Sequence, residues 1–370
     1  MKWKYSNFSD VVNDITGGNV KFQSSEYLSS GKYPIIDQGE KEIGGYTNQE
    51  DIVNKKKDVV VFGDHTKCLK FIDYDFCLGA DGVKVLEPIN ELDTKFLYFY
   101  LSTITLPNVG YSRHFKFLKE IQIPLPPLPI QKRIAEILDA ADALRRKDQE
   151  LLRKYDELAQ AIFIDMFGDP VKNEKGWEVK TIKSSTNIIT YGLTVRPQYM
   201  EEGIPLISAR ELRSGFVNYE AAPKISNADF KKLSNKCKPQ NGDILFSKTG
   251  SIGHSAIVET TKDFAVTQNA ARINFKTEFY EIYFIFALLR QEAFINKCIS
   301  LVKGNAVKDL QLGDFSEIEI ICPPIELQRK FSEISMKSNN LIKASDNNSI
   351  TSNNLFKSLL QQAFKGELVK

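Results

Sequence analysis

The chain has 370 residues, of which 42% are apolar and 26% are charged, and its formal net charge is +2. This composition can support two or three packed domains and is ordinary for a soluble protein. No apolar run approaches the ~20 residues that a membrane span needs, and the first residues lack the apolar core of a signal peptide, so we expect no membrane association.

Five cysteines occur without any Cys-x-x-Cys pair. An odd number of isolated cysteines is typical of free thiols in a reducing compartment, so we expect a cytoplasmic protein. The charge balance is nearly even, whereas a protein that binds nucleic acid alone usually carries a basic excess, because phosphate neutralisation supplies much of the affinity. If this chain binds DNA, a partner should supply much of the charge that faces the phosphates.

Residues 1–125 are predicted to form a first globular domain. Short β-like runs occur at residues 59–62, 68–72 and 83–86, separated by Gly and Asp turns, and an aromatic-rich helix is predicted at residues 94–102. Short strands with few helices among them predict a mixed α/β (α+β) domain with a twisted or barrel-like sheet.

Residues 126–169 are predicted to form a long central spacer helix. Pro129 suits its first turn, and the sequence Gly-Asp-Pro that ends at Pro170 stops it. Apolar residues recur at alternating steps of three and four, which is the pattern of a coiled-coil seam. At 1.5 Å per residue, ~35 helical residues make a rod of roughly 50 Å. The predicted seam residues are Ile137, Leu144, Leu151, Tyr155, Leu158 and Ile162.

Residues 170–322 repeat the plan of the first domain. Residues 126–137 read PPLPIQKRIAEI and residues 323–334 read PPIELQRKFSEI, an ungapped match that shares Pro-Pro, Gln, Glu and Ile. One of the chain's two tryptophans opens each copy, and a Pro strand, an Asp strand and an aromatic helix follow in the same order. Ordered self-similarity of this kind indicates duplication, so we expect two similar domains in a pseudo-twofold internal repeat.

The tail, residues 323–370, is predicted to form a second long helix. Its seam residues, by the repeat, are Leu341, Leu355 and Leu359. The middle of this helix is rich in Ser, Asn and Asp, which are poor helix formers, so we expect a kink or fraying there. We expect the two long helices to pair antiparallel as a coiled coil. The alternative is a loose C-terminal helix with a flexible stretch.

No catalytic site is evident in the sequence. The three histidines, His65, His114 and His254, have no second ligand at metal spacing, and no phosphate loop of the Gly-x4-Gly-Lys-Ser/Thr type occurs. The Asn/Asp-Pro-Pro-aromatic tetrapeptide of aminomethyltransferases is also absent. We therefore predict no catalytic residue, no metal and no cofactor in this chain. The Gly-rich run at residues 250–253 is either a simple tight turn or a contact to DNA.

Three stretches of the sequence resemble the specificity subunit of type I restriction-modification systems. Residues 121–134 fit I-x-I-P-L-P-P-L-x-x-Q-x-x-I and lead into a helix that closes at Phe-Gly-Asp, residues 167–169. Residues 318–334 begin a second copy. Residues 242–253, GDILFSKTGSIG, are similar to the family's run G-D-[IV]-L-x-S-[RK]-T-G-S-x-G. The first domain departs from that run, because FGDHTK at residues 62–67 stands in its place.

The resemblance implies a non-catalytic DNA-specificity subunit. Two target-recognition domains would each read part of a bipartite double-stranded DNA target, and the helices would hold them apart and dock two methyltransferase subunits. S-adenosylmethionine would then bind in the partner methyltransferase, and ATP and Mg would belong to partner restriction/translocase subunits. A coiled coil suits this role because half-sites about one helical turn apart need a rigid spacer.

Base reading in the major groove favours Arg or Lys toward guanine and Asn or Gln toward adenine. On this basis we predict a set of polar and basic residues as DNA contacts. In the first domain they are His65, Lys67, Arg113, His114 and Lys116. In the second domain they are Arg196, Arg210, Arg213, Lys248, Thr249, Ser251, Gln268, Asn269, Arg272, Lys303 and Lys308.

Two other classes of function stay open at this point. The even charge balance would suit a scaffold whose two domains bind protein or carbohydrate without any role on DNA. The second is a nuclease with a degenerate site, which would cleave DNA by itself in the presence of a metal ion.

Overall fold

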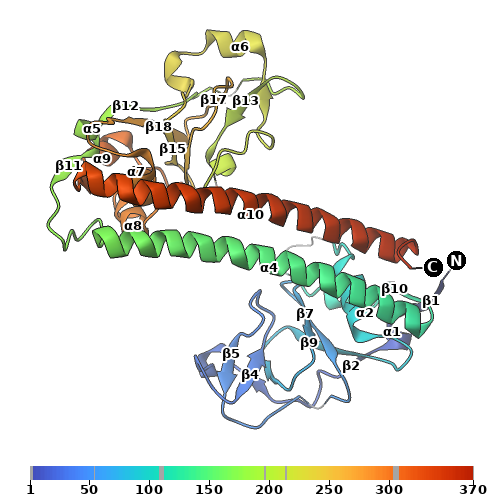
Figure 1. Ribbon diagram of the computed structural model, residues 1–370. Coiled ribbons are helices and arrows are strands. Elements are labelled where there is room, and N and C mark those ends of the chain that lie inside the picture. The colour runs from blue at the N-terminus through green and yellow to red at the C-terminus, as the bar shows by residue number, and fades with distance from the viewer. Residues whose placement is uncertain are drawn as a thin grey trace. The chain divides into compact units, whose positions relative to one another are not determined.

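A computed structural model describes residues 3–53, 55–107, 112–195, 197–212, 215–302 and 308–369. The chain divides into two compact units, whose elements are labelled in Figure 1. The first unit comprises Met1–Asp148 and Ser349–Lys370, and the second comprises Gln149–Asn348. Each unit therefore holds one globular domain together with parts of two long helices.

The first domain is built on the antiparallel sheet β2-β9-β6-β7. A second sheet, β3-β8-β4-β5, contains parallel pairs, and β1 pairs with β10. The elements are β1 (Lys4–Asn7), α1 (Phe8–Val11), β2 (Val12–Asp14), β3 (Lys21–Phe22), the 3-10 helix η1 (Ser24–Glu26), β4 (Tyr33–Ile36), β5 (Gly45–Thr47), β6 (Val59–Gly63), β7 (Leu69–Ile72), β8 (Cys77–Gly79), β9 (Val83–Pro88), α2 (Thr94–Ser102), α3 (Phe115–Leu118) and β10 (Gln122–Leu125).

The second domain follows the same plan, with the antiparallel sheet β12-β18-β15-β16, a mixed sheet β14-β13-β17 and the pair β11-β19. Its elements are β11 (Val179–Thr181), α5 (Ile182–Ser185), β12 (Thr186–Tyr191), β13 (Ile204–Ile207), η2 (Ala209–Leu212), β14 (Lys224–Ile225), α6 (Asn227–Lys232), η3 (Asn235–Cys237), β15 (Ile244–Ser247), β16 (Ser255–Ile257), β17 (Ala265–Val266), β18 (Ala270–Phe275), α7 (Ile282–Leu289), α8 (Glu292–Ser300), α9 (Leu312–Ser316) and β19 (Glu319–Ile321).

The shared topology confirms the predicted internal repeat. The Pro strand of each domain, β4 or β13, pairs in parallel with a short buried strand, so that Ile35 lies opposite Cys77 and Leu206 opposite Ala265. The Asp strand of each domain, β6 or β15, lies between two antiparallel neighbours. The aromatic helix α2 or α7 follows the sheet in each copy, so the matches of sequence order correspond to matches of structure.

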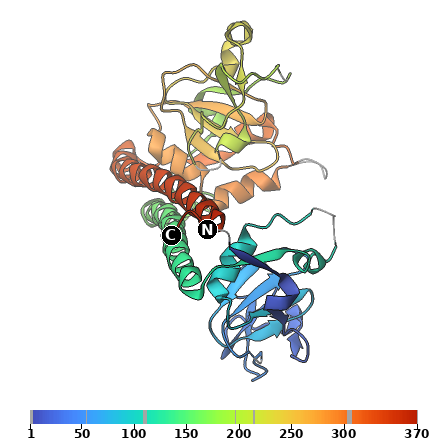
Figure 2. The same cartoon turned by 90° about the vertical axis from the view of Figure 1, so that its right-hand side faces the viewer.

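Two long helices complete the units: α4 (Leu128–Phe167) and α10 (Ile325–Lys365). They run antiparallel, as predicted (Figure 1 and Figure 2). In the first unit, Ala363 near the end of α10 joins the core that contains Ile134 and Leu138 near the start of α4. In the second unit, Phe163 near the end of α4 packs against Phe331 near the start of α10, with ring centroids 5.6 Å apart.

The helix α10 is continuous, so the prediction of a kinked or frayed middle was wrong. The low helix propensity of its Ser and Asn residues is outweighed by tertiary packing, which supplies most of the stability of a helix in a folded protein. Several of its small polar side chains lie inside rather than in water. Those that are buried are Ser335, Asn339, Ser345, Ser349 and Ser352.

The predicted coiled-coil seam was also wrong in its register. Apolar residues at alternating steps of three and four form one stripe that drifts slowly around a straight helix of ~3.6 residues per turn, and the fold buried residues displaced by about one position from that stripe. On α4 the buried residues include Leu138, Ala141 and Phe163. Ile137, Tyr155, Ile162 and Leu359 are half-buried. The leucines that are instead between 40% and 53% exposed are Leu144, Leu151, Leu158, Leu341 and Leu355.

A buried glutamine fastens the start of α4 to the first domain. Nε2 of Gln131 donates to the carbonyl oxygens of Glu91 at 2.9 Å and Pro126 at 2.8 Å. Its Oε1 accepts a hydrogen bond from the backbone amide of Asp93 at 2.8 Å. Asp93 in turn caps α2 by accepting from the amide of Phe96. The side chain of Gln131 therefore ties the start of the long helix to the start of the aromatic helix.

Gln328 repeats this arrangement at the start of α10. Its Nε2 donates to the carbonyl oxygens of Phe279 at 2.9 Å and Pro323 at 2.8 Å, and its Oε1 accepts from the amide of Glu281 at 3.1 Å. Glu281 stands at the N-terminus of α7. The Gln of the repeated Pro-Pro motif is thus a structural residue, and we call Gln131 and Gln328 the latch glutamines.

Each domain also packs on the far end of the other copy's helix. Phe364 at the end of α10 lies 5.3 Å from Phe96 of α2, measured between ring centroids. Phe167 at the end of α4 lies 4.8 Å from Phe284 of α7. Buried aromatic pairs of this kind contribute both apolar area and a preferred ring geometry. Both ends of each long helix are therefore fastened, one by a latch glutamine and the other by a phenylalanine.

Replacing either latch glutamine by alanine should lower the free energy of unfolding by about 2–4 kcal/mol, because buried amide and carbonyl groups lose their hydrogen-bond partners. Urea unfolding of the full chain, followed by circular dichroism, measures the change. Lys132→Ala, at an exposed neighbouring position, is the control and should change stability by less than about 0.5 kcal/mol. Equal losses in the control and the glutamine variants would contradict the structural role.

Candidate nucleic-acid interface

In the first domain, the predicted DNA contacts gather around the loop that follows β6. The backbone amide of His114 donates to the carbonyl oxygen of Asp64 at 2.9 Å, and the ring Nδ1 of His114 lies 3.0 Å from the same oxygen. The amide of Phe115 donates to Oδ1 of Asp64 at 2.7 Å. Asp64 and His114 are both buried, so they anchor the loop from inside.

The outward-facing side chains of this loop region are Arg113 and Lys116, which are exposed, and His65 and Lys67, which are half-buried. Lys67 has a positive φ of 63° and donates from Nζ to the carbonyl oxygen of Pro107 at 3.2 Å. His114 is only 1% exposed, so its position leaves it outside any DNA-contacting surface. The remaining four predicted residues stay candidates.

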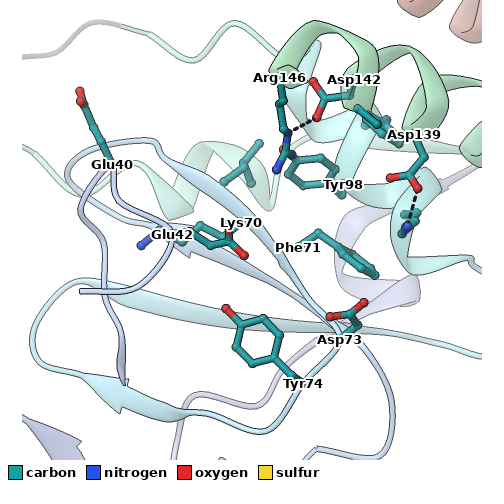
Figure 3. Close-up of a pocket in the computed structure, with 14 residues that line it drawn as sticks. Glu40, Glu42, Lys70, Phe71, Asp73, Tyr74, Tyr98, Asp139, Asp142 and Arg146 are labelled. Carbon is teal, nitrogen blue, oxygen red and sulfur yellow. Dashed lines mark hydrogen bonds and ion pairs between the residues drawn. The ribbon is translucent and has the colours of Figure 1, made fainter. Parts of the chain in front are cut away.

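An acidic hollow of about 520 Å³ lies beside α4 in the first unit (Figure 3). Its cations are already paired within the protein, Lys95 with Asp139 at 2.7 Å and Arg146 with Asp142 at 2.6 Å. A surface of this sign repels phosphates, so the hollow does not face a DNA backbone. The carboxylates that line it are Glu40, Glu42, Asp73, Asp139 and Asp142.

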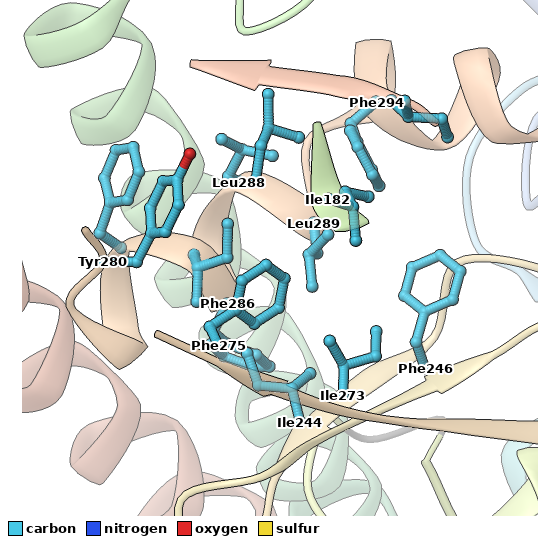
Figure 4. Close-up of a cluster of buried hydrophobic side chains, with 14 of the residues drawn as sticks. Ile182, Ile244, Phe246, Ile273, Phe275, Tyr280, Phe286, Leu288, Leu289 and Phe294 are labelled. Atoms are coloured by element: carbon cyan, nitrogen blue, oxygen red, sulfur yellow. The ribbon is translucent and has the colours of Figure 1, made fainter. Parts of the chain in front are cut away.

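In the second domain, the Gly-rich loop directly follows a strand of the hydrophobic core. Figure 4 shows Ile244 and Phe246 of β15 within the buried cluster that the sheet and α7 enclose. The next residue, Ser247, is fully buried. Its hydroxyl donates to the carbonyl oxygen of Ser251 at 2.6 Å and accepts from the amide of His254 at 2.8 Å. The loop is therefore held in one conformation at its base.

Lys248 is bound to the protein rather than free in solvent. It is 8% exposed, and its Nζ lies 2.7 Å from Oδ1 of Asp309. Thr249 donates its hydroxyl to the same carboxylate at 2.5 Å. Burial raises the pKa of Asp309, but the hydrogen bonds from Lys248 and Thr249 outweigh burial and leave that pKa below its ordinary value. Lys248 thus positions the loop, and only the loop's outer residues are available to a ligand.

Backbone hydrogen bonds join this loop to three further segments. The amide of Lys248 donates to the carbonyl oxygen of Asn269 at 3.0 Å, and the amide of Gln268 to that of Leu193 at 2.9 Å. The amide of Thr267 donates to Ile207 at 2.9 Å. The segments therefore form one continuous surface. We call it the second-domain rim, and it consists of residues 193–195, 197–199, 208–210, 249–251 and 267–269 together with Lys308, whose carbonyl oxygen accepts from Gly250 at 2.8 Å.

A cleft of about 560 Å³ lies between the rim segments 193–195, 197–199, 208–210 and 267–269 and residues 221–223. Arg210, Gln268 and Asn269, three of the predicted DNA contacts, line it together. Gly192 makes the cleft possible, because a Cβ at this position would stand 1.9 Å from the carbonyl oxygen of Val266. The absence of a side chain there lets the segment after β12 lie directly against the turn between β17 and β18.

The other predicted contacts in the second domain have varied positions. Ser251 and Lys308 are exposed on the rim, and Thr249 is half-buried there. Arg272 is 5% exposed and pairs with the buried Asp243 at 2.6 Å, so it is a structural cation within the sheet rather than a surface residue. Arg196, Arg213 and Lys303 lie outside the described residues.

Sequence reasoning missed several residues of the cleft. Val195 is 74% exposed and Tyr199 is 49% exposed, and both line it. Apolar residues in a segment with no helical or strand pattern carry no signal for a binding site in a single sequence. Only the close approach at Gly192 brings these side chains beside Gln268.

No cluster of three or more His, Cys, Asp or Glu side chains with the geometry of a metal site occurs within the ranges that the structure describes. In the same ranges, none of the helices combines the length and apolar character that crossing a bilayer requires.

Comparison with known proteins points to one family. The model of the type I restriction modification DNA specificity domain matches residues 1–153 and 174–352. The MjaIX specificity subunit of a Methanocaldococcus jannaschii type I restriction enzyme is 25% identical over 357 residues, which cover 88% of this chain and 81% of that protein. The EcoBI specificity subunit of Escherichia coli is 26% identical over 316 residues, which cover 75% of this chain and 66% of that protein.

A solved structure has the same fold. The S subunit of the type I restriction-modification system of M. genitalium aligns with a TM-score of 0.63 at 16% sequence identity, and the alignment covers 98% of this chain and 96% of that one.

The duplicated domains on two long helices and the match to the family model point to the same class of protein. The chain belongs to the type I restriction modification DNA specificity family. Specificity subunits are non-catalytic, and catalysis in type I systems lies with their partner subunits.

Lys248→Met and Asp309→Asn should each lower the free energy of unfolding by about 1–2 kcal/mol. The double variant should lose less than the sum of the two, because both substitutions remove the same ion pair. Urea unfolding at pH 7 measures this coupling. The pKa of Asp309 in the folded protein lies below its value in the unfolded chain. The stabilisation that the ionised Asp309 contributes is therefore complete at pH values above the ordinary aspartate pKa, and it is lost as pH falls through the lowered pKa. Strictly additive losses at pH 7 would show that the pair does not hold the loop.

Proposed function

We propose that this chain selects a bipartite double-stranded DNA target, with each globular domain reading one half-site. The observation that carries the proposal is the duplicated domain whose second copy presents a polar rim with unpaired Arg and amide side chains. Amides and guanidinium groups are the side chains that read base edges in the major groove. Membership of the DNA specificity family supports the same function.

The divergence of the two domains suggests that the half-sites differ. The anchor of the Gly-rich loop is Lys248 with Asp309 in the second domain, whereas Asp64 with His114 stands there in the first. The loops have the same structural role, but an ion pair anchors the second-domain loop, whereas hydrogen bonds from the backbone amides of His114 and Phe115 to Asp64 anchor the first. Different groups therefore face outward from the same place in each fold, and different base sequences should be preferred.

The two long helices are the proposed spacer. They contain 40 and 41 residues, and a continuous helix of that length extends about 60 Å. Half-sites in DNA must be engaged at a fixed separation, because the register of the double helix cannot be absorbed by flexible chain. Continuity of α10 through its polar middle favours this function, since a kinked helix would not set a separation.

The exposed leucines of the helices are the proposed docking surface for two methyltransferase subunits. Leu144 and Leu355 belong to the first unit, and Leu341 and Leu158 belong to the second. The two pairs are equivalent in the internal repeat, since Leu341 corresponds to Leu144 and Leu355 to Leu158. Exposed apolar side chains arranged along a helix are typical of a surface that a partner covers. The repeat therefore offers the same patch twice, which suits two copies of one partner.

The chemistry would be supplied entirely by partners. We propose that this chain holds no cofactor, that S-adenosylmethionine binds in the methyltransferase subunits, and that ATP and Mg bind in restriction/translocase subunits. The nearly even charge of the chain fits this division, because partner subunits would supply much of the phosphate-facing charge. We propose a cytoplasmic location, where DNA and such partners meet.

Single-molecule sequencing of methylated bases tests the function directly. DNA from cells that express this chain with its methyltransferase should carry methyl-adenine confined to one split motif, and cells without the chain should lack it. Sequence-independent methylation, or none in the presence of both proteins, would contradict the proposal and favour a scaffold function.

Leu144→Asp and Leu341→Asp should each reduce the number of methyltransferase subunits bound, because a buried unpaired carboxylate would oppose an apolar interface. Native mass spectrometry of the assembled complex measures the stoichiometry. Asn340→Asp, which is exposed beside Leu341, is the matched control and should leave assembly intact. A normal stoichiometry in both leucine variants, with unchanged unfolding, would place the docking surface elsewhere.

A further inference from the structure

The second-domain cleft contains amide groups that the protein itself does not use. The side chains of Gln268 and Asn269 and the guanidinium of Arg210 make no hydrogen bond or ion pair with any residue that the structure describes. Lys248 and Arg272, in contrast, are both committed to carboxylates inside the fold. Groups left without a protein partner at the edge of a cleft are the ones that a ligand can engage.

Gln268 is the better placed of the two amides. It is exposed, whereas Asn269 is half-buried. Its backbone is fixed by the bond from its own amide to Leu193, and the next residue is fixed by the bond from Lys248 to the Asn269 carbonyl. The turn is therefore rigid while the Gln268 side chain is free to reach outward. A primary amide offers one donor and one acceptor side by side, which matches N7 and the N6 amino group of adenine.

An apolar wall stands beside these amides. Val195 and Tyr199 line the cleft with Pro197, and Val195 is the most exposed large apolar residue of the chain's described part at 74%. An exposed valine next to hydrogen-bonding groups can pack against an apolar group of an otherwise polar ligand. In the major groove of DNA that group is the 5-methyl of thymine, which lies on the base paired with adenine.

The first domain has no equivalent of this site. The turn between β8 and β9 reads Gly79-Ala-Asp-Gly82 where the second domain has Thr267-Gln-Asn. A Cβ at Gly79 would stand 2.4 Å from the hydroxyl oxygen of Tyr27, so Tyr27 fills the space above this turn. The amide beside this turn comes instead from Gln38, whose Oε1 accepts from the backbone amide of His65 at 3.3 Å, so it is bound within the protein, unlike that of Gln268.

We propose that the second domain reads an A·T pair of its half-site, with the Gln268 amide on the major-groove edge of adenine and Val195 against the methyl group of thymine. This inference rests on the proposed function, since it names the base pair that the proposed rim recognises. Asn269 and Arg210 flank the contact and are available to neighbouring bases or phosphates.

The test uses the full chain assembled with its methyltransferase subunits and a library of duplexes in which both half-sites are randomised. Selection by binding, followed by sequencing, gives the base preference at every position. In the wild-type complex, one position of one half-site should prefer A·T. Gln268→Ala should reduce that preference by about ten-fold while the other half-site is unchanged. Gln268→Arg should shift the preference at that position toward G·C, because Arg is the side chain that pairs with guanine.

Matched controls separate the outcomes. Asn241→Ala removes another exposed amide, located before β15 and so at the opposite end of that strand from the Gly-rich loop, and should leave the motif intact. A wild-type motif that persists unchanged at every position in both Gln268 variants would overturn the inference and leave the proposed function standing. A wild-type complex with no base preference at all would overturn the proposed function itself. Unfolding curves of the Gln268 variants should match the wild type, since the side chain is exposed.

Discussion

The hydrogen bonds of the two latch glutamines are the contacts on which the rest of the structure depends. A primary amide has fixed directions for its donors and its acceptor, so three bonds from one buried side chain specify both distance and orientation. Gln131 and Gln328 use them to join the first turn of a long helix to the N-terminus of an aromatic helix. Each domain is thereby oriented on the helices of its own unit, and so is any surface that the domain presents to DNA.

The same framework holds two different recognition surfaces. Core positions are alike in the two copies because each must fill the same space between a sheet and an aromatic helix. The loops need only keep an anchor, and the anchors differ: the ion pair of Lys248 with Asp309 in one domain, and hydrogen bonds from the amides of His114 and Phe115 to Asp64 in the other. Duplication followed by divergence at the rim is therefore compatible with a constant fold, and under the proposed function it would let two half-sites be read independently.

The helices reverse the usual distribution of apolar and polar residues over part of their length. Small polar residues of α10, such as Ser335 and Ser349, are buried, while Leu341 and Leu355 face outward. Small side chains permit a close approach of backbones, and hydroxyl groups can bond to the helix's own carbonyl oxygens, as Ser352 does to Ser349. The leucines stay exposed, where the proposed docking surface lies, so a seam inferred from leucine spacing falls on the wrong face.

The sequence by itself determined the duplication, the two mixed domains, the approximate start of each long helix and the end of the first one. These features follow from local patterns: proline at helix starts, glycine after helix ends, and alternating apolar runs in strands. Much of the candidate site was also predicted, since Arg210, Gln268 and Asn269 do meet in one cleft. Their residue types alone marked them as suited to reading bases.

Only the tertiary structure decided which of these side chains are free. Lys248 and Arg272 look like DNA contacts in the sequence, but their carboxylate partners lie 61 and 29 residues away along the chain. The tertiary structure also decided which face of each long helix is buried, and that the polar middle of α10 is helical. Burial and ion pairing depend on what packs against a residue, and those neighbours come from distant parts of the chain that no local pattern specifies.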